Sequence, residues 1–229
     1  MAVQYAFGQI VTNGLVLALD AADRNSYVSG STTWRDLASG FSALITGPVT
    51  PSTGSIPALS YSGNGWVYIS SQTVFTTLTN NFTILGWINP RTTAVIGARL
   101  FGLGYINQWQ LELRGGSGTR LSLNYNNSGS NIFQQSGPTI STNTWQQVGF
   151  VISSSVFNYI YNGQISATGA FTVAGSFVNG NQNYSIGNYN TNTDGAYPGQ
   201  IASHQVYNRV LTASEILQNY NAQKSRFGL

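Results

Sequence analysis

Residues Gly199–Leu229 read GQIASHQVYNRVLTASEILQNYNAQKSRFGL, and this stretch decides the fold class of the chain. Its first part, Ile201–Asn208, has the composition of a strand. Thr212–Glu215 then forms a capping box, in which the side chains of the first and last residue satisfy each other's free backbone N–H. Ile216, Leu217 and Tyr220 follow on one helical stripe. A single amphipathic helix of about three turns is unstable alone in water, so it must dock on the preceding chain.

The preceding chain consists of short strand-like segments separated by turn signals. Trp109–Arg114 alternates apolar and polar residues, as a strand with one buried face does. Asn81–Asn89 is apolar on both faces and predicts a central strand covered on both sides. Asn162-Gly163 is a strong signal for a type I′ hairpin, and Ser62–Gly65 also predicts a hairpin between the short runs on either side of it. Many short strands with such turns predict an all-β sandwich or barrel.

The chain is expected to form one domain over residues 1–229. Residues 1–13 predict a lead-in edge strand, and residues 212–229 contain the C-terminal helix and tail. No linker, charged tail, composition shift or internal repeat divides the sequence, and 229 residues suit a single all-β sandwich.

Composition narrows the classes of function. Charged residues make up 7% of the chain, far below the roughly 25% usual in soluble domains, so weak charge repulsion favours self-association. The net charge of +3 comes from cations scattered along the chain, without the concentrated positive footprint that nucleic-acid binding needs. No apolar segment is long enough to span a membrane. With no cysteine and no secretion signal at the N-terminus, the chain is expected to fold in a reducing cytosol.

An ordered set of motifs resembles a known family. The set comprises GLVLALDAADRNSY, TTWRDLASG, ALSYSGNGWVYI, NFTILGWINP, WQQVGFVI with YIYNGQ, and GQIASHQVYNRVLTASEI, and it runs from about Asn13 to the C-terminus. It resembles a concanavalin A-like, laminin-G-like jelly roll. Its opening and closing motifs are similar to the versions of this domain found in tailed-bacteriophage virion proteins.

The resemblance implies both a fold and a function. The fold is a two-sheet antiparallel jelly-roll sandwich with one short C-terminal helix. The function is that of a non-enzymatic structural protein on a phage virion, made in the host cytoplasm, as a capsid decoration (cement) protein or a tail appendage such as a tail fibre. Its partners would be other virion proteins, further copies of itself and a host-surface glycan. The alternative is a carbohydrate-binding lectin or a glycan-cleaving enzyme of the same fold.

Catalytic chemistry finds little support in the sequence. A jelly-roll glycosidase needs two carboxylates across a groove, and the E-x-D-x-x-E pattern of the retaining enzymes of this fold is absent. Glu215 is explained by the capping box, and Glu112 is expected to pair with Arg114 or Arg120. His204 lies within a predicted strand, on a face that the pattern leaves open. We therefore expect no enzyme activity and no catalytic residues.

Metal ions and cofactors are not expected either. A calcium site needs several oxygen ligands, usually including carboxylates. Gln200 and Ser203 stand where calcium-binding relatives tend to carry acids. Asp194 and Asn64 could contribute oxygens, but a single carboxylate makes a weak site.

A glycan site would need an aromatic platform beside amide, carboxylate or guanidinium groups. The candidates are six residues of the loops and strand ends: Asn64, Trp66, Tyr189, Asn190, Asp194 and Tyr197. Tyr189 and Tyr197 lie in the polar loop NYNTNTDGAYPG and are expected to be the most exposed. The alternative for Trp66 is a place in the hydrophobic core.

The tail SRFGL carries two apolar side chains beyond the helix, Phe227 and Leu229. Exposed apolar residues favour a contact, so these two are the predicted assembly contact with a neighbouring subunit. The alternative is that they dock on their own domain. Capsid or tail location, copy number and the identity of any glycan stay open.

Overall fold

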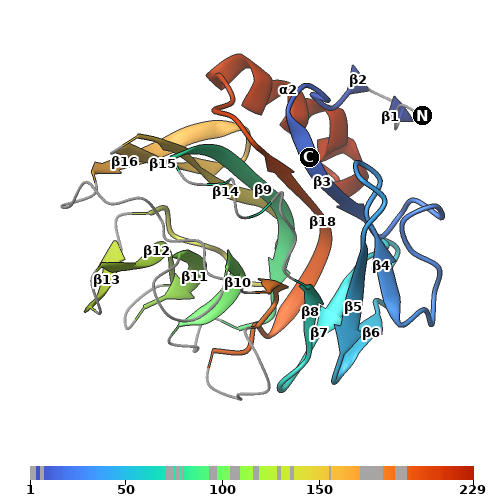
Figure 1. Ribbon diagram of the computed structural model, residues 1–229. Helices are drawn as coiled ribbons and strands as arrows, with labels where there is room; N and C mark the ends of the chain where they lie inside the picture. Colours follow the sequence, from blue (N-terminus) through green and yellow to red (C-terminus); the bar gives the residue numbers. More distant parts are fainter. Residues whose placement is uncertain are drawn as a thin grey trace.

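The strands of this chain stack as two layers, with the C-terminal helix on the outside of one layer (Figure 1). The computed structural model describes residues 4–5, 8–70, 75, 78, 80–92, 97–103, 109–115, 119–127, 130–134, 137–154, 156–170, 183–188 and 195–229. This two-sheet antiparallel arrangement with one short C-terminal helix confirms the predicted jelly-roll class. No helix in those ranges is long and apolar enough to cross a membrane.

The back sheet carries the helix. Its strand order is β16-β15-β14-β9-β18-β7-β6, and β3 pairs with β18 beside that path. Its strands are β3 (Leu15–Asp20), β6 (Val49–Pro51), β7 (Leu59–Tyr61), β9 (Asn81–Pro90), β14 (Gln146–Ser153), β15 (Val156–Tyr161), β16 (Gln164–Ala170) and β18 (Gly199–Tyr207).

The front sheet has the order β13-β12-β11-β10-β17-β8-β5-β4. Its strands are β4 (Thr33–Arg35), β5 (Ser42–Thr46), β8 (Trp66–Ile69), β10 (Ala98–Leu103), β11 (Trp109–Arg114), β12 (Arg120–Asn127), β13 (Ser130–Gln134) and β17 (Tyr184–Ile186). Helix α2 (Ala213–Gln223) and the 3₁₀ turn η1 (Lys224–Phe227) follow β18.

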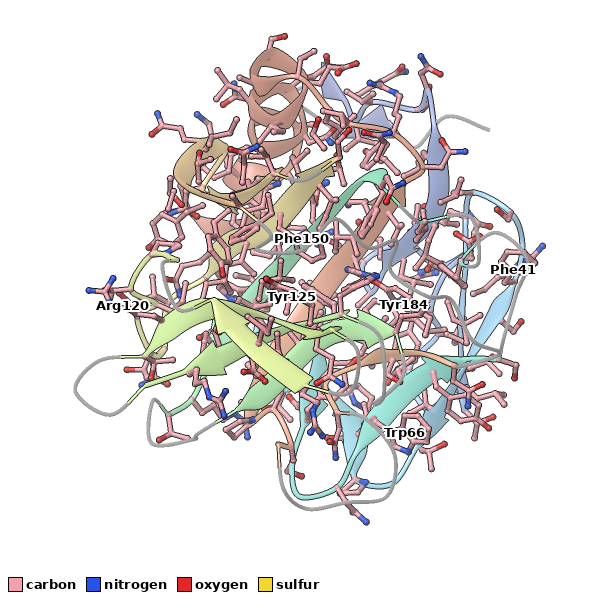
Figure 2. The ribbon with its side chains drawn as sticks, turned by 60° about the vertical axis from the view of Figure 1, so that its left-hand side comes forward. Phe41, Trp66, Arg120, Tyr125, Phe150 and Tyr184 are labelled. Atoms are coloured by element: carbon pink, nitrogen blue, oxygen red, sulfur yellow. The ribbon has the colours of Figure 1, made fainter. Side chains whose placement is uncertain are left out.

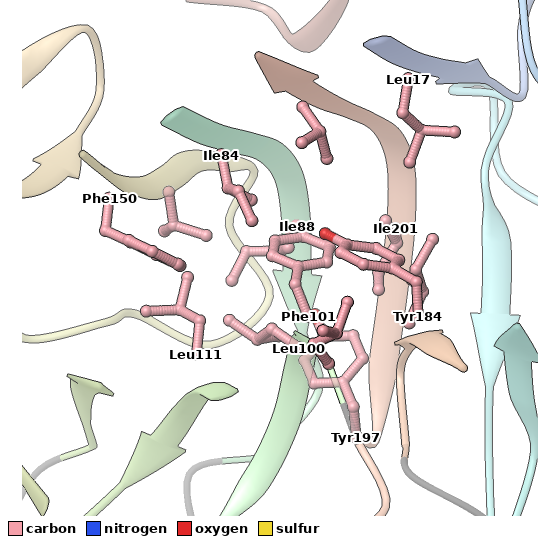
Figure 3. Packing of buried hydrophobic residues seen from close by; sticks show 14 of the residues in the cluster. Leu17, Ile84, Ile88, Leu100, Phe101, Leu111, Phe150, Tyr184, Tyr197 and Ile201 are labelled. Atoms are coloured by element: carbon pink, nitrogen blue, oxygen red, sulfur yellow. The ribbon is translucent and has the colours of Figure 1, made fainter. Parts of the chain in front are cut away.

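The main hydrophobic core fills the space between the two sheets (Figure 3). Ile84 and Phe150 enter it from the back sheet, and Leu111 and Tyr184 enter it from the front sheet. The predicted central strand is confirmed, because β9 lies between β14 and β18 and is buried on both faces. Burial of alternate residues from both sheets supplies most of the driving force for this sandwich.

His204, whose face the sequence left open, points into this core and is fully buried. Its ring stacks on Phe101 with ring centroids 4.0 Å apart. Its Nδ1 lies 3.0 Å from the carbonyl oxygen of Leu85, so Nδ1 carries the proton and donates it. Its Nε2 therefore accepts from the Tyr184 hydroxyl at 2.6 Å. Burial lowers the pKa of His204 to about 3, which holds the ring neutral.

Helix α2 docks on the outer face of the back sheet, as its need for a partner predicted. Thr212 and Glu215 form the predicted capping box, and Arg209 adds an ion pair to Glu215 at 2.6 Å. Ile216 packs into an apolar cluster with Leu85 and Tyr207 of the sheet, whereas the prediction for Leu217 on the same stripe was wrong, because it is 44% exposed. The helix thus uses tertiary contacts for stability that its short length alone could not supply.

Two local predictions were wrong. Ser62–Gly65 does not close a hairpin, because β7 pairs within the back sheet and β8 pairs within the front sheet. The turn instead carries the chain from one layer to the other. In the predicted lead-in strand, the described part forms a separate two-stranded sheet of β1 (Gln4–Tyr5) and β2 (Gly8–Gln9), so it is not an edge of the sandwich.

The Asn162-Gly163 hairpin is confirmed between β15 and β16. Both residues have positive φ, 47° and 78°, as a type I′ turn requires. A Cβ atom on Gly163 would lie 2.7 Å from Cβ of Tyr220. The turn therefore needs glycine both for its backbone conformation and for its close approach to α2.

Candidate functional site

The outer face of the front sheet holds the candidate functional site. The outer face of the back sheet is occupied by α2 and η1, whereas neither of these elements packs on the front sheet. Trp109, Leu111 and Leu113 of β11 point into the core, so Gln110, Glu112 and the residues level with them point outward. The clean alternation seen in the sequence placed these side chains correctly.

A charged cluster, which we call the polar face, lies on β10, β11 and β12. Its members are Arg99, Gln110, Glu112, Arg114 and Ser122. Arg99 Nε donates to Gln110 Oε1 at 2.8 Å, and Arg114 Nη1 lies 3.4 Å from Glu112 Oε1. Glu112 is directly opposite Arg99 on one side and Ser122 on the other. The predicted ion pair between Glu112 and Arg114 is confirmed.

Glu112 is the chemically distinctive group of the polar face. It is only 2% exposed, and burial raises the pKa of its carboxyl to about 7, although Arg114 and Arg99 both act to lower it. Glu112 Oε1 and Ser122 Oγ are buried without a hydrogen-bond partner. Buried polar atoms normally have partners, so these two oxygens leave hydrogen-bonding capacity unused beneath the polar face, with only the 3.4 Å ion pair to Arg114 near Glu112 Oε1.

An aromatic pair lies on β8 of the same face. Val67 and Ile69 of this strand belong to the core. Successive side chains of a strand point to opposite faces, so Trp66 and Tyr68 point outward. Their rings stack with centroids 4.5 Å apart and an interplanar angle of 21°. Trp66 is 9% exposed and Tyr68 is half-buried, so Tyr68 offers the larger accessible surface. Figure 2 shows Trp66 at the periphery, away from Phe150 in the interior.

The two groups belong to one continuous surface. Gln110 is opposite Gly102, Gly102 is opposite Ser185, and Ser185 is opposite Tyr68. Neighbouring strands lie about 4.8 Å apart, so this row extends over roughly 14 Å. Ser185, like Gly102, presents no large side chain along it. The row therefore runs from an aromatic ring at one end to a carboxyl and guanidinium groups at the other. Tyr68, Arg99 and Arg114 are partly exposed, whereas Gln110, Glu112 and Ser185 are at most 5% exposed.

Three of the six predicted glycan-site residues, Asn64, Trp66 and Tyr197, lie in the described part of the chain. Asn64 is exposed in the turn that precedes β8, directly before the aromatic pair. Tyr189, Asn190 and Asp194 lie outside the described residues. Tyr197 was expected to be exposed, and that expectation was wrong. It is fully buried, because its ring packs against Tyr61 and its hydroxyl donates to the carbonyl oxygen of Gln200.

The sequence reasoning missed Tyr68, Ser185, Arg99 and Gln110 as members of this surface. Gln110 was placed on the polar side of its strand, so alternation held the necessary signal for it. For the others, membership depends on which strands are neighbours, and β8, β17 and β10 are separated widely in the sequence.

The predicted assembly contact is corrected at one of its two residues. Phe227 is only 7% exposed, and its ring stacks on Trp87 with centroids 4.0 Å apart. Arg226 beside it forms an ion pair with Asp20 at 2.7 Å, which fixes the tail on its own domain. Leu229 is 50% exposed. The tail docks intramolecularly through Phe227, so Leu229 is the one of these two apolar side chains that stays accessible.

The polar face offers one carboxylate from the described residues. The other described acids serve structural purposes or lie elsewhere: Asp20 pairs with Arg226, Asp36 accepts from three backbone N–H groups, Asp23 accepts from Asn25, and Glu215 caps α2. Nowhere in the described chain do three or more His, Asp or Glu side chains gather as metal ligands would. The arrangement is suited to binding hydroxyl groups and a ring face.

Solved structures of other proteins share this architecture. Domain 4 of an extracellular arabinanase from Geobacillus stearothermophilus, in complex with arabinotriose, matches with a TM-score of 0.67 and 18% identity, over 90% of this chain and 98% of that one. The binding domain of Paraclostridial Mosquitocidal Protein 1 matches with a TM-score of 0.70 and 16% identity, over 92% of this chain and 52% of that one.

A sialidase from Trypanosoma rangeli, in complex with sialic acid, matches with a TM-score of 0.70 and 16% identity, over 96% of this chain and 34% of that one. At these identities the likeness concerns the fold alone. No curated protein sequence matches this chain. The family model described as the concanavalin A-like lectin/glucanases superfamily matches residues 61–217, which cover most of both sheets, and the chain belongs to that family.

Proposed function

We propose that this chain is a non-enzymatic structural protein on the surface of a tailed-phage virion and that its front sheet binds a host-surface glycan. The observation that carries the binding proposal is the row of outward-pointing side chains from Tyr68 to Glu112, with Tyr68, Arg99 and Arg114 as its accessible members. A similar structure that is matched over 98% of its length is a complex with arabinotriose, which supports a sugar ligand for this architecture.

The surface matches the chemistry of a sugar ring. The C–H face of a pyranose packs on an aromatic ring, and its hydroxyl groups need donors and acceptors at fixed positions. Tyr68, held in place by the stacked Trp66, supplies the ring. Glu112 and Ser122 supply oxygens that lack a hydrogen bond, and the partly exposed Arg99 and Arg114 supply donors beside them.

The virion placement rests on the sequence. The opening and closing motifs resemble domains of tailed-phage virion proteins, and a chain with only 7% charged residues has little charge repulsion to oppose packing against other subunits. In this role the chain decorates a capsid or forms part of a tail appendage, beside other virion proteins and copies of itself.

A glycan array with the purified chain tests the binding proposal. Tyr68→Ala should abolish binding to any glycan that the wild-type chain retains, whereas Tyr68→Phe should keep it because the ring stays. Leu217→Ala is a matched control, since Leu217 is 44% exposed on α2 at the opposite side of the sandwich. The binding proposal fails if no glycan binds, or if Tyr68→Ala binds as well as the wild type while its melting temperature is unchanged.

Stoichiometry tests the virion proposal. Quantitative mass spectrometry of purified virions should find this chain, with hundreds of copies indicating capsid decoration and a handful indicating a tail component. Its absence from virions of the phage that encodes it would refute the placement.

One observation favours the enzymatic alternative. A buried carboxyl with a pKa of about 7 has the proton that a general acid needs near neutral pH. A two-carboxylate glycosidase also needs a second acid on the same face, and the described residues supply none there. Release of reducing ends from a bound glycan, lost in Glu112→Gln, would establish cleavage and overturn the non-enzymatic proposal.

A further inference from the structure

A cavity lies beside the back sheet, and its lining includes no residue of the polar face. It has a volume of about 590 Å³ and opens between two loops, residues 21–29 after β3 and residues 51–58 between β6 and β7. The elements that carry these loops gather on one side of the molecule (Figure 1). This volume lies within the range of about 300–1,000 Å³ that is typical of small-molecule sites.

Both walls of the cavity are fixed by hydrogen bonds. In the first loop, the backbone N–H of Tyr27 donates to the carbonyl oxygen of Asp23 at 2.8 Å. In the second, Ser52 Oγ donates to the carbonyl oxygen of Ile56 at 2.8 Å and accepts from the backbone N–H of Ala58 at 3.1 Å. A site held in this way is formed before a ligand arrives, which reduces the entropy lost on binding.

The lining combines one cation with apolar rings. Arg24 is exposed and, in the described part of the chain, forms no ion pair. The nearby carboxylates are engaged elsewhere, since Asp23 accepts from Asn25 and Asp20 pairs with Arg226. The rings of Tyr27, Pro51 and Pro57 and the side chain of Val28, which is 63% exposed, form the apolar part.

We propose that this cavity binds an acidic sugar, with the carboxylate paired to Arg24 and the apolar face of the sugar ring packed on Tyr27 and the prolines. A guanidinium recognises a planar carboxylate through two parallel hydrogen bonds, and a pyranose ring of monosaccharide size fits the volume. The site is distinct from the polar face in its residues, its sheet and the charge of its ligand. It does not depend on the function proposed for the front sheet.

The test uses galacturonic acid and galactose, which differ only in having a carboxylate or a hydroxymethyl group at the same ring position. In NMR titrations of the full chain, galacturonic acid should shift the resonances of Arg24 and Tyr27, and galactose should bind at least tenfold more weakly. Arg24→Gln should weaken galacturonic acid binding about tenfold. Arg35→Gln removes the same charge from an exposed site outside the cavity and should leave the affinity unchanged.

Each further outcome has a defined meaning. Equal affinity for the two sugars, or unchanged binding in Arg24→Gln, overturns the acidic-sugar site. Displacement of galacturonic acid by an equal concentration of inorganic phosphate shows a general anion site and also overturns it. Loss of galacturonic acid binding in Tyr68→Ala but not in Arg24→Gln places the sugar on the front sheet, which refutes this site while supporting the function proposed above.

Discussion

Glu112→Gln tests how burial controls the polar face, and its effect should depend on pH. The wild-type carboxyl is almost completely buried, and its pKa in the folded chain is about 7 against an ordinary value of 4.5. Between these pH values the folded chain binds more protons than the unfolded chain. Stability is therefore lost as pH rises through this window, because the folded state must then hold a desolvated carboxylate. Glutamine has the same shape and does not ionise.

The magnitude follows from the shift. Each pKa unit corresponds to about 1.4 kcal/mol, so the shift of Glu112 limits the effect to about 3 kcal/mol. At pH 8, Glu112→Gln should raise the free energy of unfolding by up to that amount. At pH 4 the wild-type carboxyl is protonated in both states, so the variant and the wild type should be nearly equal. Glycan binding should fall in the same variant, since the ligand loses its carboxylate partner.

Urea unfolding at pH 4 and pH 8 measures this difference, and Glu215→Gln is the matched control. The Arg209 side chain lowers the pKa of Glu215 to about 2. Its ionised form stabilises the fold above pH 4.5, and that contribution disappears as pH falls toward 2. Glu215→Gln should therefore lower stability at pH 8, the opposite sign to Glu112→Gln. If Glu112→Gln shows no gain at pH 8 over pH 4, the carboxyl is not desolvated as described and the reasoning is refuted.

Three further predictions concern the core, the tail and one turn. Phe227→Ala should lower the free energy of unfolding by about 3 kcal/mol and leave the oligomeric state unchanged in size-exclusion chromatography. Leu229→Ala should change the free energy of unfolding by no more than about 0.5 kcal/mol. A changed oligomeric state of Phe227→Ala with unchanged stability would contradict the intramolecular docking of the tail. The ring of His204, with its pKa of about 3, should stay neutral in NMR spectra from pH 8 down to pH 5. The free energy of unfolding should decrease as the pH is lowered below about 6.5, the pKa of histidine in the unfolded chain, because only the unfolded chain then takes up the proton. A ring titration with a midpoint above pH 5 would refute the buried neutral ring. Gly163→Ala should cost more than Gly30→Ala in thermal unfolding, because both have positive φ but only Gly163 has a neighbour within 4 Å that a Cβ would meet; equal losses would mean that α2 yields to the added methyl group.

Local sequence determined much of this protein. The capping box at Thr212 and Glu215 starts α2 where predicted, because both partners lie within one turn of the helix. Asn162-Gly163 closes its hairpin because positive φ at two successive residues is a property of those residues alone. Alternation in β11 placed Gln110 and Glu112 opposite the core, since successive side chains of a strand point to opposite faces.

The tertiary structure alone decided which strands are neighbours. Ser62–Gly65 has the residues of a hairpin, yet it joins two sheets, because pairing with β17 and β18 far along the chain determines where its flanking strands lie. For the same reason Tyr68 and Glu112 share one surface. Tyr197 and Phe227 are buried because partners distant in sequence cover them. Alternation along a strand predicts which face of the sheet a side chain occupies. Long-range pairing between strands determines which other side chains lie on that face.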